Sequence, residues 1–419
     1  MGIHRRFRSL APRHKAAVAV RFDIVVGPRM RCRHFLGASL GKAPWRHPKG
    51  FTIPGVALVL AVLMAACGTS APKVASPSAR SAATLPANAP PPVAQSPTPV
   101  ASLDALECPI ATHCLAAGSS SSGKAVVENS TDAGRTWSPA DVVGTVGSLA
   151  GLACATQETC VAVGGGAVVR STDGGQRWHT VATSVGKATL TDVACPTATT
   201  CVATAVANRP AVGGTEGVIL VSDNAGSTWS DASVPPFATG LYSVACTSAK
   251  DCLAVGGTIL FTTDGGTTWQ NRAVAGGMNG LSSIACPNPA LCLALGPNPA
   301  GIYNPQASAD YVRSLDGGHS FTHATLAAAS ATLWALSCSS ATACVAGGNA
   351  LPGQPAAVFA TTDGGSTWQR GNSPAGVARI LALSCSAATC VAAGTSLTGT
   401  AVVASTANAG QTWQAGVIR

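Results

Sequence analysis

The chain has 419 residues, enough for one large domain or two ordinary ones, and a formal net charge of +9. Residues 1–66 hold twelve of the 26 Lys and Arg side chains and a single acidic residue, Asp23, whereas the rest of the chain has 14 basic and 16 acidic residues, a net charge of −2. The positive charge therefore belongs to a leader segment and does not argue for a nucleic acid partner. We expect no nucleic acid partner.

The leader has the composition of an export signal. Residues 1–50 form a basic extension, long enough that Met30 is an alternative start, and residues 51–66 contain the apolar run "IPGVALVLAVLMAA", too short to span a membrane. The following "LMAAC" resembles a bacterial lipobox, with Met64 in place of the usual Leu. The resemblance implies cleavage before Cys67 and a diacylglycerol anchor on its thiol, hence a lipoprotein on the extracellular face of the cell membrane. The alternative is an ordinary signal peptide and a secreted protein.

A tether follows the signal. Residues 67–102 begin with Cys67 and contain eight prolines and little to bury, which predicts a disordered or polyproline II segment. At ~3.1 Å per residue it could hold a domain up to roughly 100 Å from a membrane.

Residues 103–419 contain seven repeated units of 40–52 residues. Each opens with a short apolar stretch that ends in the first cysteine of a pair. Five residues separate the two cysteines in the first six pairs, and four separate them in the last. The pairs are Cys108 and Cys114, Cys154 and Cys160, Cys195 and Cys201, Cys246 and Cys252, Cys286 and Cys292, Cys338 and Cys344, and Cys385 and Cys390.

Short Val-, Leu- and Ala-rich segments bounded by turn residues, with few helix signals, predict an all-β chain. The repeat length has room for four short strands, here called A to D in chain order. We therefore expect a seven-bladed β-propeller of four-stranded antiparallel blades. Residues that face each other across a hairpin have Cα atoms about 4.5–5.5 Å apart, so each cysteine pair is expected to form a disulfide across the A–B hairpin of its blade. The alternative, metal binding, is disfavoured because this spacing is not a common zinc pattern. No metal or cofactor is expected.

An octet such as "STDGGQRW" (171–178) follows each pair and is predicted to form the C–D turn. Its Asp can accept hydrogen bonds from the turn backbone, its Gly supplies an unusual backbone angle, and its Trp packs between strands or blades. Asn replaces Asp twice and Phe321 replaces Trp once, so we interpret the octet as structural rather than catalytic. The residues at the Asp position are Asp132, Asp173, Asn224, Asp264, Asp316, Asp363 and Asn408.

These octets resemble the Asp-box, or BNR repeat, of sialidases, sortilin-type receptors, some glucanases and photosystem II assembly-factor propellers. The Cys-x5-Cys pairs resemble those of exported actinobacterial propellers. The resemblance implies a β-propeller but no particular function. A sialidase would need an arginine triad and a Tyr–Glu pair with an Asp acid/base, and no such set can be nominated. Glu107 and Glu128 are interpreted as structural.

From each Asp position to the next unit's first cysteine the interval is always 22 residues, so the length variation falls between strands B and C. Those B–C connections are expected on the rim opposite the octets, where recognition is usually found. The long connections of units three and five flank the short unit four and predict a ligand-binding cleft, whose candidate residues are Arg209, Glu216, Arg272, Tyr303, Asn304, Asp310 and Tyr311. The alternative is solvated loops without a ligand.

The sequence therefore favours a monomeric, non-catalytic, membrane-tethered propeller that binds an envelope protein or glycan, or helps to assemble a complex. The alternative is an extracellular glycoside hydrolase, sialidase-like in fold, with atypical catalytic residues. How the ring closes is left open.

Overall fold

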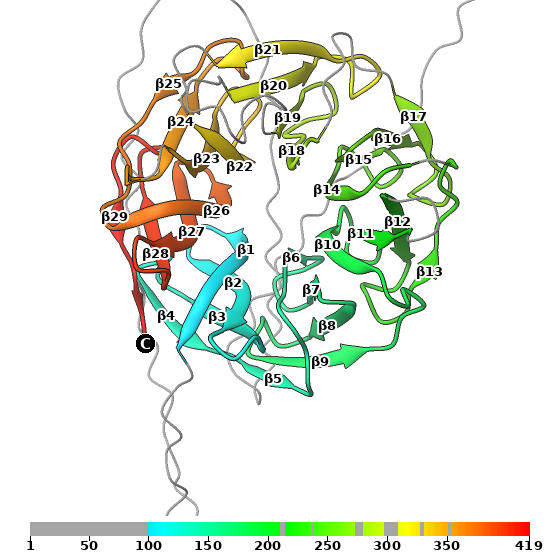
Figure 1. Ribbon diagram of the computed structural model, residues 1–419, viewed down its shortest axis with the longest axis horizontal. Helices are drawn as coiled ribbons and strands as arrows, with labels where there is room; N and C mark the ends of the chain where they lie inside the picture. The colour runs from blue at the N-terminus through cyan, green and yellow to red at the C-terminus, as the bar shows by residue number, and fades with distance from the viewer. Residues whose placement is uncertain are drawn as a thin grey trace, which may run out of the picture. The chain divides into compact units, whose positions relative to one another are not determined.

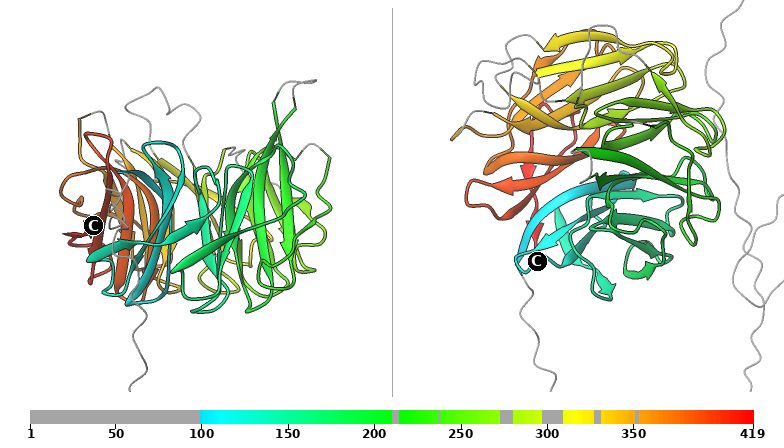
Figure 2. Two further views of the ribbon diagram at one scale, coloured as in Figure 1. Left: turned by 90° about the horizontal axis from the view of Figure 1, so that it is seen from below. Right: turned by 45° about the vertical axis from the view of Figure 1, so that its right-hand side comes forward.

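The computed structural model describes residues 99–209, 214–236, 238–272, 280–296, 309–326, 331–350 and 353–419. They form a seven-bladed β-propeller (Figure 1), as expected. Each blade is an antiparallel sheet of four consecutive strands, A to D, with A innermost, and the strands run between the two faces of the ring (Figure 2). The first strand begins at Val100, three residues before the predicted domain boundary at 103. The predicted leader and Cys67 lie outside the described residues.

The strands of the first three blades have the following bounds. Blade 1 comprises β1 (Val100–Ile110), β2 (His113–Ser120), β3 (Ala125–Ser130) and β4 (Thr136–Pro139); blade 2 comprises β6 (Gly151–Cys154), β7 (Cys160–Gly164), β8 (Ala167–Ser171) and β9 (Arg177–Val181); blade 3 comprises β10 (Thr189–Ala194), β11 (Cys201–Asn208), β12 (Thr215–Ser222) and β13 (Ser230–Asp231).

The other four blades continue in chain order. Blade 4 comprises β14 (Leu241–Cys246), β15 (Cys252–Gly256), β16 (Ile259–Thr262) and β17 (Gln270–Arg272); blade 5 comprises β18 (Ser283–Ala285), β19 (Cys292–Gly296), β20 (Ala309–Ser314) and β21 (Thr322–Leu326); blade 6 comprises β22 (Thr332–Cys338), β23 (Cys344–Asn349), β24 (Ala357–Thr361) and β25 (Gln369–Arg370); blade 7 comprises β26 (Val377–Ser386), β27 (Thr389–Ser396), β28 (Ala401–Thr406) and β29 (Gln414–Ala415).

The core lies between the blades. Seven clusters of buried apolar side chains each join one blade to the next, and one of them joins blade 7 to blade 1. Both faces of each sheet are covered, which explains why strand B reads as a continuous apolar run, for instance "CVAVG" in β7, with every residue buried. The apolar faces therefore stabilise the ring as a whole rather than single blades.

All seven predicted disulfides are present, with Cα–Cα distances of 3.9–4.2 Å, slightly shorter than the expected range. Each joins the end of strand A to the start of strand B; Cys246 and Cys252, for example, are direct cross-strand partners. The bridges lie within single blades and none joins distant blades.

The octets have the expected structural role. In blade 6, Oδ1 of Asp363 accepts hydrogen bonds from Thr361 Oγ1 and from the Thr367 N–H, each at 2.8 Å. In blade 3, Asn224 makes the same two bonds through its Oδ1. The fourth octet residue of each blade donates its N–H to a carbonyl of the A–B turn in the same blade. Octets and disulfide turns therefore share one rim of the ring, as the topology predicted.

The octet glycine also explains how one blade packs against the blade before it. Gly175 has φ +84°, and a Cβ there would overlap the side chain of Leu115 in blade 1. The indole N–H of Trp178 donates to the Gly175 carbonyl at 2.9 Å and fixes the Trp ring in the core. Only glycine meets both the backbone and the space requirement at this position.

Ring closure uses the outer edge of blade 1. Short segments leave blades 1 and 7 and pair, in parallel, with the outer strand of the next blade: β5 (Asp141–Val143) with β9, and β30 (Val417–Ile418) with β4. Strand β30 follows blade 7 near the carboxyl end of the chain. Its pairing with β4 joins blade 7 to blade 1 in the same way that the pairing of β5 with β9 joins blade 1 to blade 2. The closure that the sequence left open is therefore an ordinary inter-blade contact and not a shared blade.

Candidate functional site: the axial channel

The innermost strands share a pattern that positions side chains on the ring axis. An almost completely buried Leu or Ile stands five residues before the first cysteine of every blade. These anchors are Leu103, Leu149, Leu190, Leu241, Leu281, Leu333 and Ile380. Since both the anchor and the cysteine are fixed by the core and the disulfide, the residues between them are held in equivalent places in all seven blades.

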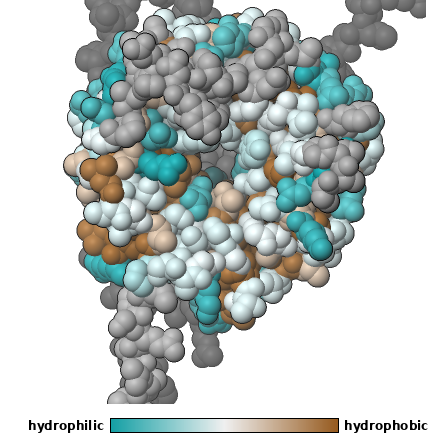
Figure 3. Space-filling model, in the orientation of Figure 1, coloured by the Kyte–Doolittle hydropathy of each residue, from teal (hydrophilic) through white to brown (hydrophobic). Residues whose placement is uncertain are grey.

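The first two or three residues after each anchor line a cavity of about 180 Å³ at the centre of the ring, the axial channel. The space-filling view shows the molecule hollowed at this point (Figure 3). The first of these residues, here called the axial position, differs in chemistry from blade to blade. From blade 1 to blade 7 it is occupied by Asp104, Ala150, Thr191, Tyr242, Ser282, Trp334 and Leu381.

A β-bulge presents the axial residue to the channel. In five blades the A–B register shifts immediately after the anchor, so that the axial residue has no cross-strand partner. A bulge bends its strand and re-aims a side chain. Strand B accommodates the bend with a glycine opposite the anchor in most blades: a Cβ at Gly118 would overlap the Ser102 carbonyl. In blade 3 this position is Ala205.

Polar side chains tie the inner strands together around the channel. Asp192 Oδ2 accepts hydrogen bonds from Ser243 Oγ at 2.8 Å and from the Val244 N–H at 3.0 Å, joining blades 3 and 4. At the closing seam, Ser384 Oγ of blade 7 accepts a bond from the Cys108 N–H at 3.0 Å. The carboxylate of Asp192 is thus partly structural, and the channel wall is rigid.

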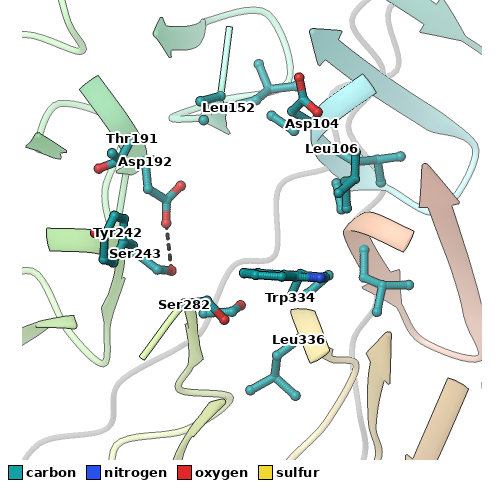
Figure 4. Close-up of a pocket in the computed structure, with 18 of the residues that line it drawn as sticks. Asp104, Leu106, Leu152, Thr191, Asp192, Tyr242, Ser243, Ser282, Trp334 and Leu336 are labelled. Carbon is teal, nitrogen blue, oxygen red and sulfur yellow. Dashed lines mark hydrogen bonds between the residues drawn. The ribbon is translucent and has the colours of Figure 1, made fainter. Parts of the chain in front are cut away.

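The channel has two chemically different halves (Figure 4). Asp104 and Asp192 project from blades 1 and 3, whereas Tyr242 and Trp334 project from blades 4 and 6. Ser102 donates to Asp104 Oδ2 at 2.8 Å, and Asn349 Oδ1 accepts from the Trp334 indole N–H at 2.6 Å. Two carboxylates therefore line the same cavity as an aromatic wall, Tyr242 and Trp334, whose Trp ring is held in place and reaches into the cavity (Figure 4).

Burial raises the pKa values of the two acids that line the channel, Asp104 and Asp192, and of the nearby Glu107. Burial, with the negative charge of Asp192, raises the pKa of Glu107 to about 7. Burial raises the pKa of Asp192 to about 6, against the lowering effect of its hydrogen bonds from Val244, Ser243 and Val193. It also raises the pKa of Asp104, although the Ser102 hydrogen bond opposes it.

Two of the predicted cleft residues form a pair of their own. Arg209 and Glu216 lie on the hairpin between β11 and β12, where Arg209 donates to both carboxylate oxygens of Glu216 at 2.6 and 2.7 Å. Both side chains are about 35% exposed, so this is a surface ion pair with its hydrogen-bonding groups turned toward each other. Tyr303 and Asn304 lie outside the described residues.

Arg272 and Asp310 face the same inter-blade seam. Arg272 pairs in register with Ile259 and lies over the Phe261 ring, 4.4 Å from its centroid, on the side of blade 4 that meets blade 5. Asp310 alternates with Val312 and so faces blade 4, where His323 Nε2 lies 3.4 Å from its Oδ2. The Nε of Arg272 and the Oδ1 of Asp310 are buried, and neither has a hydrogen-bond partner among the residues that the structure describes.

Tyr311 is a correction to the sequence analysis. Its side chain is 5% exposed in the core between blades 5 and 6, and its hydroxyl donates to the Gly365 carbonyl at 2.9 Å. It does not line a cleft. Strand β20 begins at Ala309, so Tyr311 belongs to the strand and not to the B–C connection, and the alternation of the strand turns it away from Asp310.

The axial residues themselves were missed. The signal that could have found them is the constant five-residue interval from the apolar anchor to the first cysteine. The residue directly after the anchor differs in every unit, for example Asp104 in the first and Trp334 in the sixth. Among the described residues there is no group of three metal-ligating side chains close enough to hold an ion. No helix in that part of the chain has the length and hydropathy needed to cross a membrane.

A scan of protein-family models and a search of curated proteins find no match. Solved structures show the same fold at low identity. YCF48 bound to D1 peptide is 15% identical, with TM-score 0.52, over 73% of this chain and 92% of that one; YCF48 from Cyanidioschyzon merolae is 15% identical, with TM-score 0.50, over 74% and 96%. The WD40 β-propeller domain of Doa1 is 9% identical, with TM-score 0.51, over 72% and 92%. Identities this low establish the architecture and nothing more specific.

Proposed function

We propose that the protein is a non-catalytic binding or assembly propeller, tethered to the outer face of the cell membrane through Cys67, that captures an envelope protein or glycan. One observation carries the proposal. The seven blades repeat their core, their disulfides and their octets, yet the axial positions differ in charge, size and aromaticity. The packing of the blades does not fix the residue type at these positions, and all of them surround one cavity. Variable residues around a cavity on a regular scaffold are typical of a binding site.

A likeness of fold to YCF48, which was solved with a D1 peptide, agrees with a binding role and does not identify the ligand. An extracellular glycoside hydrolase is the competing function. It would need two facing carboxylates, and Asp104 and Asp192 are the acids that project into the channel. Asp192 is committed to three hydrogen bonds of the wall, which favours binding over catalysis.

The test combines proximity labelling from the anchored protein in its own cells with turnover assays on aryl-glycoside and sialoside substrates. We expect a reproducible set of labelled envelope partners that is lost in Cys67→Ala, because release from the membrane removes the local concentration, and no turnover. Repeatable turnover that disappears in Asp104→Asn, Asp310→Asn or Glu216→Gln would instead establish an enzyme.

A further inference from the structure

We propose that the axial channel binds the cationic end of a basic side chain, the ammonium of lysine or the guanidinium of arginine. This inference rests on the proposed binding function and names the chemistry that the same site recognises. It follows from three independent features of the channel: its charge, its aromatic wall and its size.

The charge of the channel is negative and uncompensated within its lining. Asp104 and Asp192 project into the cavity, and Glu107 lies close enough to Asp192 for their charges to interact. None of the described residues that line the cavity is Lys, Arg or His. Desolvated carboxylates attract a cation more strongly than they would in water, and they exclude an anion.

The aromatic wall is not required by the fold. At the equivalent axial position blades 2, 3 and 5 carry Ala150, Thr191 and Ser282, so blade packing tolerates small side chains there. Trp334 is nevertheless large, and Asn349 holds its indole N–H. A cation within about 6 Å of an indole face is attracted to its π electrons, and the methylenes of a lysine or arginine stem pack well against the same ring.

The size of the cavity favours the tip of a side chain. At about 180 Å³ it is smaller than the ~300–1,000 Å³ of ordinary small-molecule pockets. An oligosaccharide would need more room than this, whereas one extended basic side chain places its charge between the two acidic blades and its stem along Trp334. The same chemistry could also come from a free organic amine.

The experiment titrates the full-length protein, in detergent, with an end-capped peptide Gly-Ser-Gly-Lys-Gly-Ser-Gly by isothermal calorimetry. The matched control peptide has norleucine in place of lysine, which keeps the methylenes and removes the charge. We expect the lysine peptide to bind at least about tenfold more tightly, and less tightly at 500 mM than at 50 mM NaCl. Butylammonium is the third probe: affinity equal to the peptide would assign the site to free amines, and weaker affinity to a protein partner.

Four variants locate the binding. Asp104→Asn and Trp334→Leu should each weaken the lysine peptide by about fivefold or more, whereas Asp223→Asn, an exposed acid on the octet rim, should leave it unchanged. Ala150→Lys changes an exposed axial residue, so folding is expected to persist, and its own ammonium should occupy the channel and abolish peptide binding.

Equal affinity for the norleucine peptide, or no binding of the lysine peptide at 10 mM, would overturn the proposal, as would binding of a neutral glycan that Ala150→Lys does not affect. If the lysine peptide fails while proximity labelling still finds envelope partners, the channel chemistry is wrong and the binding function stands. If both fail, the proposed function falls as well.

Discussion

At the scale of single residues, the octet shows how a carboxylate can be conspicuous and still structural. Oδ1 of Asp363 accepts two hydrogen bonds of the turn, and its Oδ2 accepts a third from Thr367 Oγ1 at 2.6 Å. Asn224 reproduces the set by donating its amide to Thr228 Oγ1 at 2.7 Å. The turn therefore forms with either a carboxylate or an amide at this position, because both supply an oxygen at one site and a polar atom at the other.

We therefore predict that Asp363→Asn lowers the free energy of unfolding at pH 7 by no more than about 1 kcal/mol, since every hydrogen bond has a counterpart and only the added strength of a charged acceptor on an exposed turn is lost. Asp363→Ala should cost about 1–2 kcal/mol, because three turn donors lose their acceptor. Urea unfolding monitored by circular dichroism measures both. A large loss in the Asn variant would show that the charge itself matters.

Glu128 is the opposite case, a carboxyl where the fold calls for an apolar side chain. It is 2% exposed, its Oε2 has no hydrogen-bond partner, and it pairs in register with Ala116 on the face of blade 1 that meets blade 7. The equivalent residues of the other blades are Val169, Leu220, Leu260, Val312, Phe359 and Ala404, all buried. Burial raises the pKa of Glu128 to about 7.

Glu128→Leu should stabilise the protein at pH 7.5 by about 2–3 kcal/mol. A raised carboxyl pKa means that the folded state disfavours the charged form, so wild-type stability falls as the pH rises from about 4.5 through about 7. The gain should therefore shrink at pH 4.5. Urea unfolding at both pH values tests this, with the exposed Glu158→Leu as control; an equal gain at both would contradict the explanation.

At the scale of elements, repetition decided what could be predicted. Seven copies of a cysteine pair and an octet predicted the blade number, the disulfides and the rim that both share, because each copy reports the same hairpin geometry. The channel could not be predicted in that way, since it arises where one variable residue from each blade converges on the axis. Tyr311 shows the second limit: β20 begins at Ala309, so a residue that was assigned to the B–C connection lies in the strand and packs in the core.

Each disulfide is expected to stabilise its own hairpin and little else. Changing Cys246 and Cys252 together to alanine should lower the free energy of unfolding by about 2 kcal/mol, because the closed loop is short and the β14–β15 ladder remains. The Cys385 and Cys390 pair should behave alike. Calorimetric unfolding of both double variants measures the loss, and failure of either to fold would show that a bridge does more than join one hairpin.

At the scale of the whole molecule, two groups of acids act in opposite directions on stability. Turn hydrogen bonds from Thr136, with further bonds from Ser130 and Arg135, lower the pKa of Asp132 to about 2, and Asp316 and Asp363 have pKa values of about 2 for the same kind of reason. Their contribution is present above about pH 4 and is lost as the pH falls toward 2. Glu107, Glu128 and Asp192, whose pKa values burial raises, destabilise the fold increasingly from about pH 4 to 7.

Thermal unfolding between pH 2 and 8 should consequently show maximum stability near pH 4–5, lower than the usual neutral optimum. Glu128→Leu should move the maximum upward. A wild-type maximum at pH 7 or above would mean that the buried acids carry no such penalty.

The central claim is that recognition lies in the axial channel while the octets only hold the ring rigid. The most direct measurement is quantitative proximity labelling from the protein in its own cells in three forms: wild type, Trp334→Leu with Asp104→Asn in the channel, and Asp363→Asn in an octet. The account predicts that the channel variant loses the wild-type partners and that the octet variant keeps them. Loss of partners in the octet variant with retention in the channel variant, both folded, would contradict it.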